Sequence, residues 1–157
     1  MINSEELLSF LTQKLPYEQR IVSYIDQSGL QHYVDKFTAI PNLEDITLKV
    51  EGMEKYSKEI WNFCVNSAEI RNFEGPMTAH CFFAHPGSPS FGRHTDPDDV
   101  LIYCTEGIKT LYVENEYYEL RPGEAVFIKA NTPHKITNKY KSVMLSIGFE
   151  RFLVDKL

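Results

Sequence analysis

The most constraining feature of this sequence is a series of short apolar or alternating segments that begins at Pro76. The segments cover 77–84, 99–105, 108–114, 117–121, 124–129 and 142–150. Turn-forming residues separate them at 86–88, 106–107, 115–116, 122–123 and 131–133. Many short strands with this punctuation are typical of a β-sandwich or a β-barrel. The aromatic content of 13% favours β-structure as well.

The first 72 residues have a different, partly helical pattern. Apolar residues recur at helical spacing after an expected N-cap at Ser4, and this helix is predicted to end at Pro16. We predict further helices over 21–29 and 53–66, and short strands over 34–40 and 46–50.

No Gly/Ser-rich linker separates this N-terminal extension, 1–72, from the predicted barrel core, 76–150. The sequence therefore predicts a single domain over 1–157, mainly β, with helices packed outside a barrel.

Charge and hydropathy exclude several classes of protein. The 16 Lys and Arg residues and 22 Asp and Glu residues give a formal net charge of −6, which disfavours a nucleic-acid partner. The N-terminus lacks a basic region before an apolar one, so we expect no signal peptide. The longest apolar run, 100–104, is far too short to cross a bilayer.

Cysteine usage favours a reducing compartment. Cys64, Cys81 and Cys104 are widely spaced, form no Cys-x-x-Cys motif and are odd in number. We therefore expect three small buried hydrophobic residues with free thiols, in a cytoplasmic protein with no membrane partner.

The residues most suggestive of chemistry are His94 and Asp96, with His134 following 40 residues after the first histidine. Side chains two apart on a strand point to the same side, so His94 and Asp96 can converge on one point inside a barrel. A second histidine from a neighbouring strand completes two imidazoles and one carboxylate. That set is used by non-haem Fe(II) oxygenases, and it leaves metal positions open for a co-substrate and O2.

Two stretches of sequence resemble known families. Residues 120–138 contain a Pro-Gly turn, a Glu, a strand and Pro-His with Asn138 four residues later, which resembles the second motif of the cupin family. Residues 82–102 contain an aromatic strand, Pro-Gly-Ser, Phe-Gly-Arg-His-Thr-Asp and an Asp-Val strand. This stretch resembles the iron-binding region of JmjC-type oxygenases, nearest the cupin-like subgroup that contains the ribosomal-protein hydroxylases.

The resemblance implies a double-stranded β-helix with Fe(II) on His94, Asp96 and His134, and with 2-oxoglutarate as co-substrate. It also implies a role for Lys109, which lies 15 positions after the first ligand. In the resembled enzymes a lysine on the next strand binds the distal carboxylate of 2-oxoglutarate. A carboxylate that is carried into a barrel needs a buried cation, which makes this role physically reasonable.

Four other residues are candidates for binding the co-substrate. Tyr103 and Thr105 share a strand face by period two and are expected to hydrogen-bond the same carboxylate. Asn138 follows the second histidine closely enough to contact the co-substrate. His80 occupies a position where many of the resembled enzymes carry Asn beside the iron.

The leading hypothesis is an Fe(II)- and 2-oxoglutarate-dependent oxygenase, most simply a hydroxylase of a small molecule, an amino acid or a peptide side chain. One alternative is a metal-dependent cupin enzyme without 2-oxoglutarate, a dioxygenase or an isomerase. Such cupins usually carry His-x-His and a later Glu, and Asp96 replaces the second His here. The other alternative is a non-catalytic metabolite-binding cupin, which has no need of three metal ligands.

The resemblance covers residues 77–150 only. Ribosomal-protein hydroxylases recognise their substrates with regions outside the barrel, so a ribosomal substrate is not implied. Cupins often dimerise through barrel edges, and the resemblance therefore also implies a homodimer.

Overall fold

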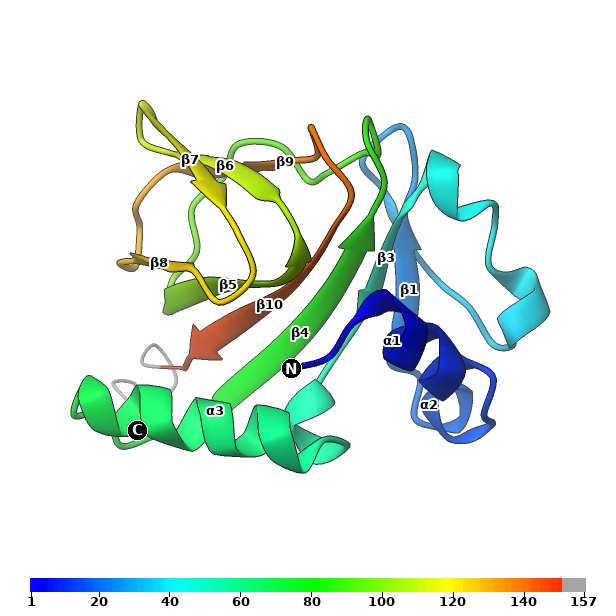
Figure 1. Ribbon diagram of the computed structural model, residues 1–157, viewed down its shortest axis with the longest axis horizontal. Helices are drawn as coiled ribbons and strands as arrows, with labels where there is room; N and C mark the ends of the chain where they lie inside the picture. Colours follow the sequence, from blue (N-terminus) through cyan, green and yellow to red (C-terminus); the bar gives the residue numbers. More distant parts are fainter. Residues whose placement is uncertain (151–157) are drawn as a thin grey trace.

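The computed structural model describes residues 1–150, and its centre is a barrel of antiparallel strands (Figure 1). Its α-helices are α1 (Ser4–Leu11), α2 (Leu15–Glu18) and α3 (Lys58–Ile70), with short 3-10 turns at Phe37–Ala39, Leu43–Asp45 and Met53–Lys55. Its strands are β1 (Val22–Ile25), β2 (Gln31–Tyr33), β3 (Thr47–Val50), β4 (Met77–Ala84), β5 (Asp99–Gly107), β6 (Lys109–Val113), β7 (Glu116–Leu120), β8 (Ala125–Ile128), β9 (His134–Thr137) and β10 (Ser142–Phe149).

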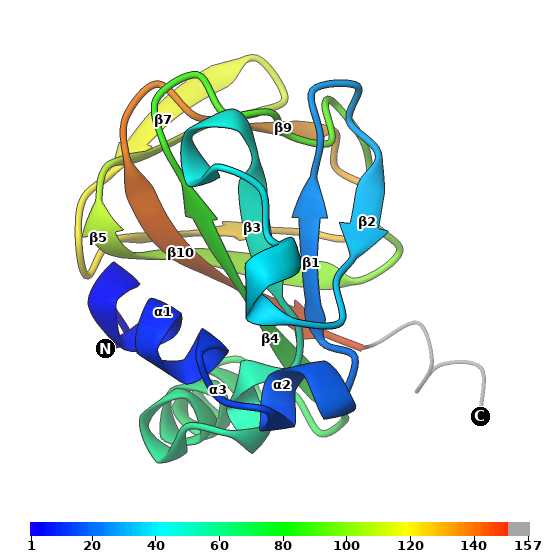
Figure 2. The same ribbon diagram turned by 90° about the vertical axis from the view of Figure 1, so that its right-hand side faces the viewer.

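The strands form two sheets. The larger sheet has the order β2-β1-β3-β4-β10-β5-β8, and the smaller one has the order β7-β6-β9. Strands that are distant in sequence are neighbours, because β10 lies between β4 and β5. Figure 2 shows the barrel from the side of β1, β2 and β3, with the three α-helices gathered at one end. The predicted fold class, a mainly β cupin-type barrel with N-terminal helices outside it, is confirmed.

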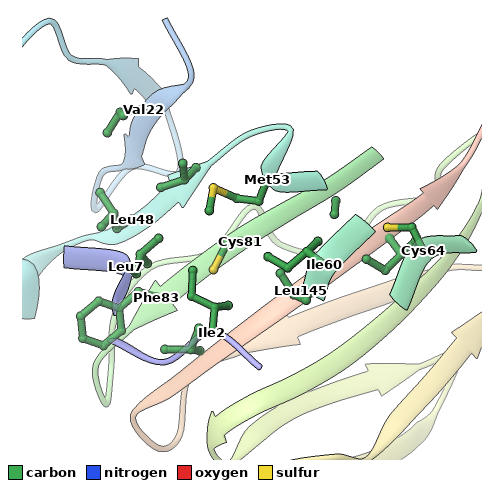
Figure 3. Close-up of a cluster of buried hydrophobic side chains, with 14 of the residues drawn as sticks. Ile2, Leu7, Val22, Leu48, Met53, Ile60, Cys64, Cys81, Phe83 and Leu145 are labelled. Carbon is green, nitrogen blue, oxygen red and sulfur yellow. The ribbon is translucent and has the colours of Figure 1, made fainter. Parts of the chain in front are cut away.

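The helices cover the outer face of the larger sheet. Leu7 of α1 and Ile60 of α3 are fully buried against Cys81, Phe83 and Leu145 of β4 and β10 (Figure 3). Burying one such aliphatic side chain contributes about 1.5–3 kcal/mol, which offsets the entropy lost when short helices are ordered. The N-terminal half and the barrel therefore share one core.

Strand alternation separates this outer core from the barrel interior. On β4, Cys81 and Phe83 face the helices, so His80 and Phe82 face the interior. On β10, Leu145 faces the helices, and its neighbours on both sides face the interior. The outer face is mostly apolar, whereas the inner face carries the polar side chains that make a site.

The helix predicted over 21–29 is wrong, because this segment forms β1 and the turn into β2. β1 pairs with β2 and β3, so Val22 packs in the core with Leu7 and Leu48 while Ile25 faces the barrel interior. Gly29 has φ +81° in a turn in which its N–H donates to the Asp26 carbonyl. A glycine with positive φ serves a helix end and a hairpin equally well, and the apolar run is too short to distinguish them.

Other boundaries also differ. The strand expected over 34–40 is wrong, because this segment contains a 3-10 turn at 37–39 and the nearest strand, β2, ends at Tyr33. The N-cap of α1 is Asn3, whose side chain accepts from the Glu6 N–H, rather than Ser4. The strand over 46–50 and the helix after Met53 are confirmed, with the helix extended to Ile70.

The three cysteines are free and buried, as predicted. Burial raises the pKa of the Cys81 thiol to about 12. Among residues 1–150, no helix is long and apolar enough to cross a membrane.

Candidate metal centre and its cavity

The connection between β4 and β5 carries His94 and Asp96, and β9 begins at His134. His94 is not on a regular strand, which corrects the sequence-based expectation. It is held instead by one isolated bridge, in which the backbones of His94 and His134 exchange two hydrogen bonds of 2.9 Å. The imidazole rings consequently lie side by side, with centroids 4.4 Å apart.

Asp96 completes a compact cluster of three ligand-type side chains. One ligand atom from each of His94, Asp96 and His134 lies within 4.8 Å of the others. The Asp96 Oδ2 is 3.0 Å from the His134 Nε2 and 3.7 Å from the His94 Nε2. The Asn131 N–H donates to the Asp96 carbonyl at 2.7 Å and fixes the loop that places the carboxylate.

The outer nitrogens of both histidines bind backbone carbonyls. His94 Nδ1 lies 2.8 Å from the Gly92 carbonyl, and His134 Nδ1 lies 2.9 Å from the Thr132 carbonyl. A carbonyl only accepts, so each Nδ1 carries the proton and each Nε2 is directed to the cluster. Backbone carbonyls that fix histidine tautomers in this way are typical of metal ligands.

The electrostatics of the cluster also suit a cation. The hydrogen bond with Asp96 raises the pKa of His134, and the same bond lowers the pKa of Asp96. The carboxylate is thus ionised and attracts a positive charge at the Nε2 position. A divalent cation and this proton compete for the same place.

The cluster opens into a cavity of about 330 Å³ between the two sheets. Its floor is formed by Lys109 of β6 and Asn138, which follows β9. Its apolar wall comes from the larger sheet and includes Val100, Ile102 and Met144. A cavity of this size, with few polar groups among apolar side chains, has the character of a small-molecule site.

Lys109 is buried inside the barrel, with 1% of its surface exposed. Its Nζ donates to the Asn138 Oδ1 at 2.5 Å and to the Thr137 carbonyl at 3.5 Å. No carboxylate in the described part of the chain forms an ion pair with it. Burial lowers the pKa of Lys109 to about 7. An unpaired buried ammonium is costly, so this position suits an anionic ligand.

Asn138 is fixed in one orientation by the backbone around it. Its Nδ2 donates to the Ser88 carbonyl at 2.9 Å and to the Pro89 carbonyl at 3.3 Å. Because the amide nitrogen is used in this way, the Oδ1 must face Lys109. Asn138 therefore positions the ammonium at the floor of the cavity.

His80 also lines the cavity, from β4. Its Nδ1 accepts from the Gly52 N–H at 3.2 Å, so the neutral ring carries its proton on Nε2. Burial, followed by the nearby charge of Lys49, lowers the pKa of His80 to about 4. His80 is thus a neutral hydrogen-bond donor at neutral pH.

Tyr103 and Thr105 are not brought to this site, which corrects the sequence-based expectation. Tyr103 packs on Phe63 of α3, with ring centroids 4.5 Å apart, and Thr105 Oγ1 donates to the Val143 carbonyl at 3.2 Å. Alternate residues of β5 do point to opposite faces, as expected, but this alternation does not tell which set of residues faces inward. Val100 and Ile102 occupy the inner face.

Several cavity residues were not predicted from the sequence, and the most consequential are Thr47 and Lys49 of β3 and Phe91 of the β4–β5 connection. The segment 47–50 alternates polar and apolar residues, which is the signal that an inner polar face exists. The sequence alone did not connect this face with His94, because β3 joins the site only through its pairing with β4.

The fold and the cluster together define a cupin-type barrel with a His-Asp-His candidate metal site. Residues 82–148 match the family model of the cupin domain. No curated protein sequence matches the chain.

Solved structures of YcfD, a ribosomal oxygenase from Escherichia coli, share the fold. One, in complex with cobalt and succinic acid, has a TM-score of 0.75 and 18% identity over 94% of this chain and 43% of its own. Another, in complex with cobalt and 2-oxoglutarate, has a TM-score of 0.73 and 19% identity over 98% of this chain and 46% of its own. A third structure of YcfD has a TM-score of 0.76 and 19% identity, with coverage of 98% and 46%.

These matches confirm the resemblance to cupin-type oxygenases at the level of the fold. They extend through the N-terminal half, which the sequence motifs did not reach. The chain spans less than half the length of the YcfD chains that it matches.

Proposed function

We propose that this chain is an Fe(II)- and 2-oxoglutarate-dependent oxygenase that hydroxylates a small molecule, an amino acid or a peptide side chain. The observation that carries the proposal is that one cavity contains both the His94–Asp96–His134 cluster and the unpaired ammonium of Lys109. The first feature fits a metal ion, and the second fits an anion near that ion.

His94, Asp96 and His134 would hold the metal ion through two nitrogens and one oxygen. This donor set is the one that non-haem Fe(II) oxygenases use, and it leaves positions open. When bound there, iron together with 2-oxoglutarate supplies the activation of O2 for oxidation of a C–H bond. The residues of the chain would bind the metal ion, orient the co-substrate and the substrate, and exclude water.

Lys109 would bind the distal carboxylate of 2-oxoglutarate by a charge-assisted hydrogen bond. Asn138 holds the ammonium in place, and the apolar wall of Ile102 and Met144 keeps water from the pair. His80 would offer its Nε2–H to an oxygen of the co-substrate.

The solved structures support this proposal by their bound groups. YcfD has been crystallised with cobalt and with 2-oxoglutarate or succinic acid. At 18–19% identity this is support from a shared fold, and the substrate of YcfD is not transferred to this chain.

The test is anaerobic loading with Fe(II), followed by titration with 2-oxoglutarate. We expect a weak visible charge-transfer band that needs both components, and succinate formation once O2 is admitted. Lys109→Met should bind Fe(II) normally and should require about 100-fold more 2-oxoglutarate, as expected when a buried charge loses its partner. Lys36→Met, which removes an exposed lysine, is the matched control.

The alternatives predict different results. Tight metal binding with no band and no binding of 2-oxoglutarate would favour the metal-dependent cupin enzyme instead. Failure to bind Fe(II), Co(II) or Mn(II) would favour the non-catalytic metabolite-binding cupin.

A further inference from the structure

The cavity contains a second lysine, Lys49, which the proposed function does not use. We propose that Lys49 forms a separate anion subsite that binds the carboxylate of the prime substrate. The substrate class is then a small carboxylic acid with an apolar body, not a cationic side chain. This inference rests on the proposed function, because it places the substrate beside the metal and 2-oxoglutarate.

Lys49 reaches the cavity from β3, where it pairs with Phe82 of β4. Its side chain is 13% exposed. Its Nζ lies 5.7 Å from the centre of the Phe82 ring and 5.6 Å from the centre of the Phe91 ring. Two aromatic rings at this distance attract an ammonium and restrict its motion. The charge is therefore ordered before any ligand arrives.

The acid nearest to Lys49 does not satisfy it. Glu51 Oε1 lies 3.5 Å from the Lys49 Nζ, which is longer than a charge-assisted hydrogen bond of about 2.8 Å. Both Glu51 oxygens accept from the Tyr33 hydroxyl, at 2.9 and 3.1 Å. Glu51 does not line the cavity. The N–H donors of Lys49 remain available to a ligand inside it.

The charge balance of the cavity also favours an anionic substrate. The charged side chains that line it are Lys49, Lys109 and Asp96, while His80 is neutral at neutral pH. Within this lining, two lysines and a divalent metal outweigh one carboxylate by three positive charges, and dianionic 2-oxoglutarate removes two of them. Glu51, 3.5 Å from the Lys49 Nζ, offsets part of the Lys49 charge from outside the lining. A substrate carboxylate would reduce the positive charge that remains inside the cavity, whereas a cationic substrate would add to it.

The position of Lys49 relative to the metal ligands limits the size of the substrate. Phe91, which packs over Lys49, precedes His94 by three residues in the same connection. Three residues span at most about 11 Å of chain. A small acid with a body of a few carbons, held at Lys49 by its carboxylate, is therefore the class of substrate to test in this cavity. Butanoate, hexanoate, benzoate and phenylacetate belong to this class.

The experiment uses the full chain loaded with Mn(II) and saturating 2-oxoglutarate under anaerobic conditions. Mn(II) binding is first verified by electron paramagnetic resonance, and 2-oxoglutarate binding by calorimetry. Each of the four acids and its primary amide is then titrated, and paramagnetic broadening of the probe protons is measured. Lys49→Met, Lys49→Arg, Lys109→Met and the exposed-site control Lys36→Met are compared with wild type.

For at least one acid, we expect the proton resonances to be broadened at a concentration at least tenfold lower than that needed to broaden those of its amide. Lys49→Met should weaken that binding on the order of 10- to 100-fold, the loss typical of a hydrogen bond to a charged group, and leave 2-oxoglutarate affinity unchanged. Lys49→Arg should retain most of the preference, and Lys36→Met all of it.

Three results would overturn the inference. They are equal broadening of acids and amides, wild-type behaviour of Lys49→Met, and loss of 2-oxoglutarate binding in Lys49→Met as severe as in Lys109→Met. The third would assign Lys49 to the co-substrate. Absence of Mn(II) or 2-oxoglutarate binding to wild type would reject the proposed function, and this inference with it. Normal binding of both without a preference for acids rejects the Lys49 subsite alone.

Discussion

The Lys109 ammonium donates a 2.5 Å hydrogen bond to the Asn138 Oδ1 at the floor of the cavity. An amide oxygen orients an ammonium but does not neutralise it. No carboxylate within residues 1–150 forms an ion pair with this lysine, and burial lowers its pKa to about 7. The charge at the floor therefore depends on pH near neutrality and on the presence of an anion.

The affinity for 2-oxoglutarate is expected to fall as the pH rises above about 7. Below that pH, Lys109 is already protonated in the free protein. Above it, binding must add a proton, because a carboxylate partner raises the pKa of the lysine, and the affinity falls by up to about tenfold per pH unit. Calorimetry with Mn(II), in buffers of different ionisation enthalpy, measures both the affinity and the proton uptake.

Lys109→Arg is the matched control for this pH dependence, because a guanidinium stays charged throughout. Its affinity should be lower than that of wild type, and its proton uptake above pH 7 should disappear. The same proton uptake in both proteins would show that Lys109 is not the titrating group.

Asn138→Asp places a carboxylate where the amide oxygen now accepts from Lys109. The lysine then has an internal anionic partner, and the new charge repels 2-oxoglutarate. We expect affinity for 2-oxoglutarate to fall on the order of 100-fold, with unchanged Mn(II) binding. Calorimetry measures the affinity for 2-oxoglutarate, and electron paramagnetic resonance measures Mn(II) binding. An unchanged 2-oxoglutarate affinity would contradict the placement of the co-substrate at Lys109.

Asp96→Ala removes the only carboxylate of the candidate metal cluster. Binding of Mn(II) or Co(II) should weaken at least about 100-fold, because loss of a residue that only supports a ligand already costs about 10- to 100-fold. In the metal-free protein the pKa of His134 should fall, because the hydrogen bond with Asp96 is the main cause of its elevation. Nuclear magnetic resonance titration of the imidazole reports this shift independently of activity.

The control for Asp96→Ala is Asp35→Ala, which removes an exposed acid in the N-terminal half. It should leave both the metal affinity and the His134 titration unchanged. Undiminished metal binding by Asp96→Ala would exclude the His-Asp-His cluster as the metal site.

Gly107→Ala should be strongly destabilising. Gly107 has φ +70° at the end of β5, and a Cβ there would lie 1.9 Å from the Lys141 carbonyl oxygen. Relief requires β10 to move, so we expect a loss of about 3 kcal/mol in the free energy of unfolding, measured with urea. Gly123→Ala has a similar φ of +91° but no atom within 4 Å, and should lose only about 1 kcal/mol. Equal losses in the free energy of unfolding would show that the positive φ, and not the clash with Lys141, accounts for the effect of both substitutions.

Short-range patterns in the sequence determined much of the fold. The turn signals after Pro76 placed β4, β5, β6, β7, β8 and β10 to within a few residues, because each turn needs specific residue types. The same patterns failed at 21–29, where the few apolar residues Ile21, Val22 and Ile25 fit a short helix and a strand equally. Pairing with β3, distant in sequence, decided it.

The sequence also identified His94, Asp96, His134 and Lys109 as candidates, because their residue types and spacing are unusual in combination. Tertiary structure decided which candidates meet. Strand phase turned Tyr103 to Phe63 of α3 and Thr105 to the Val143 carbonyl, since alternation fixes two faces but does not say which one is inside. Lys49 joined the cavity only because β3 pairs with β4 across a long stretch of chain. Such long-range pairings depend on how the whole barrel buries its apolar surface, which no local pattern records.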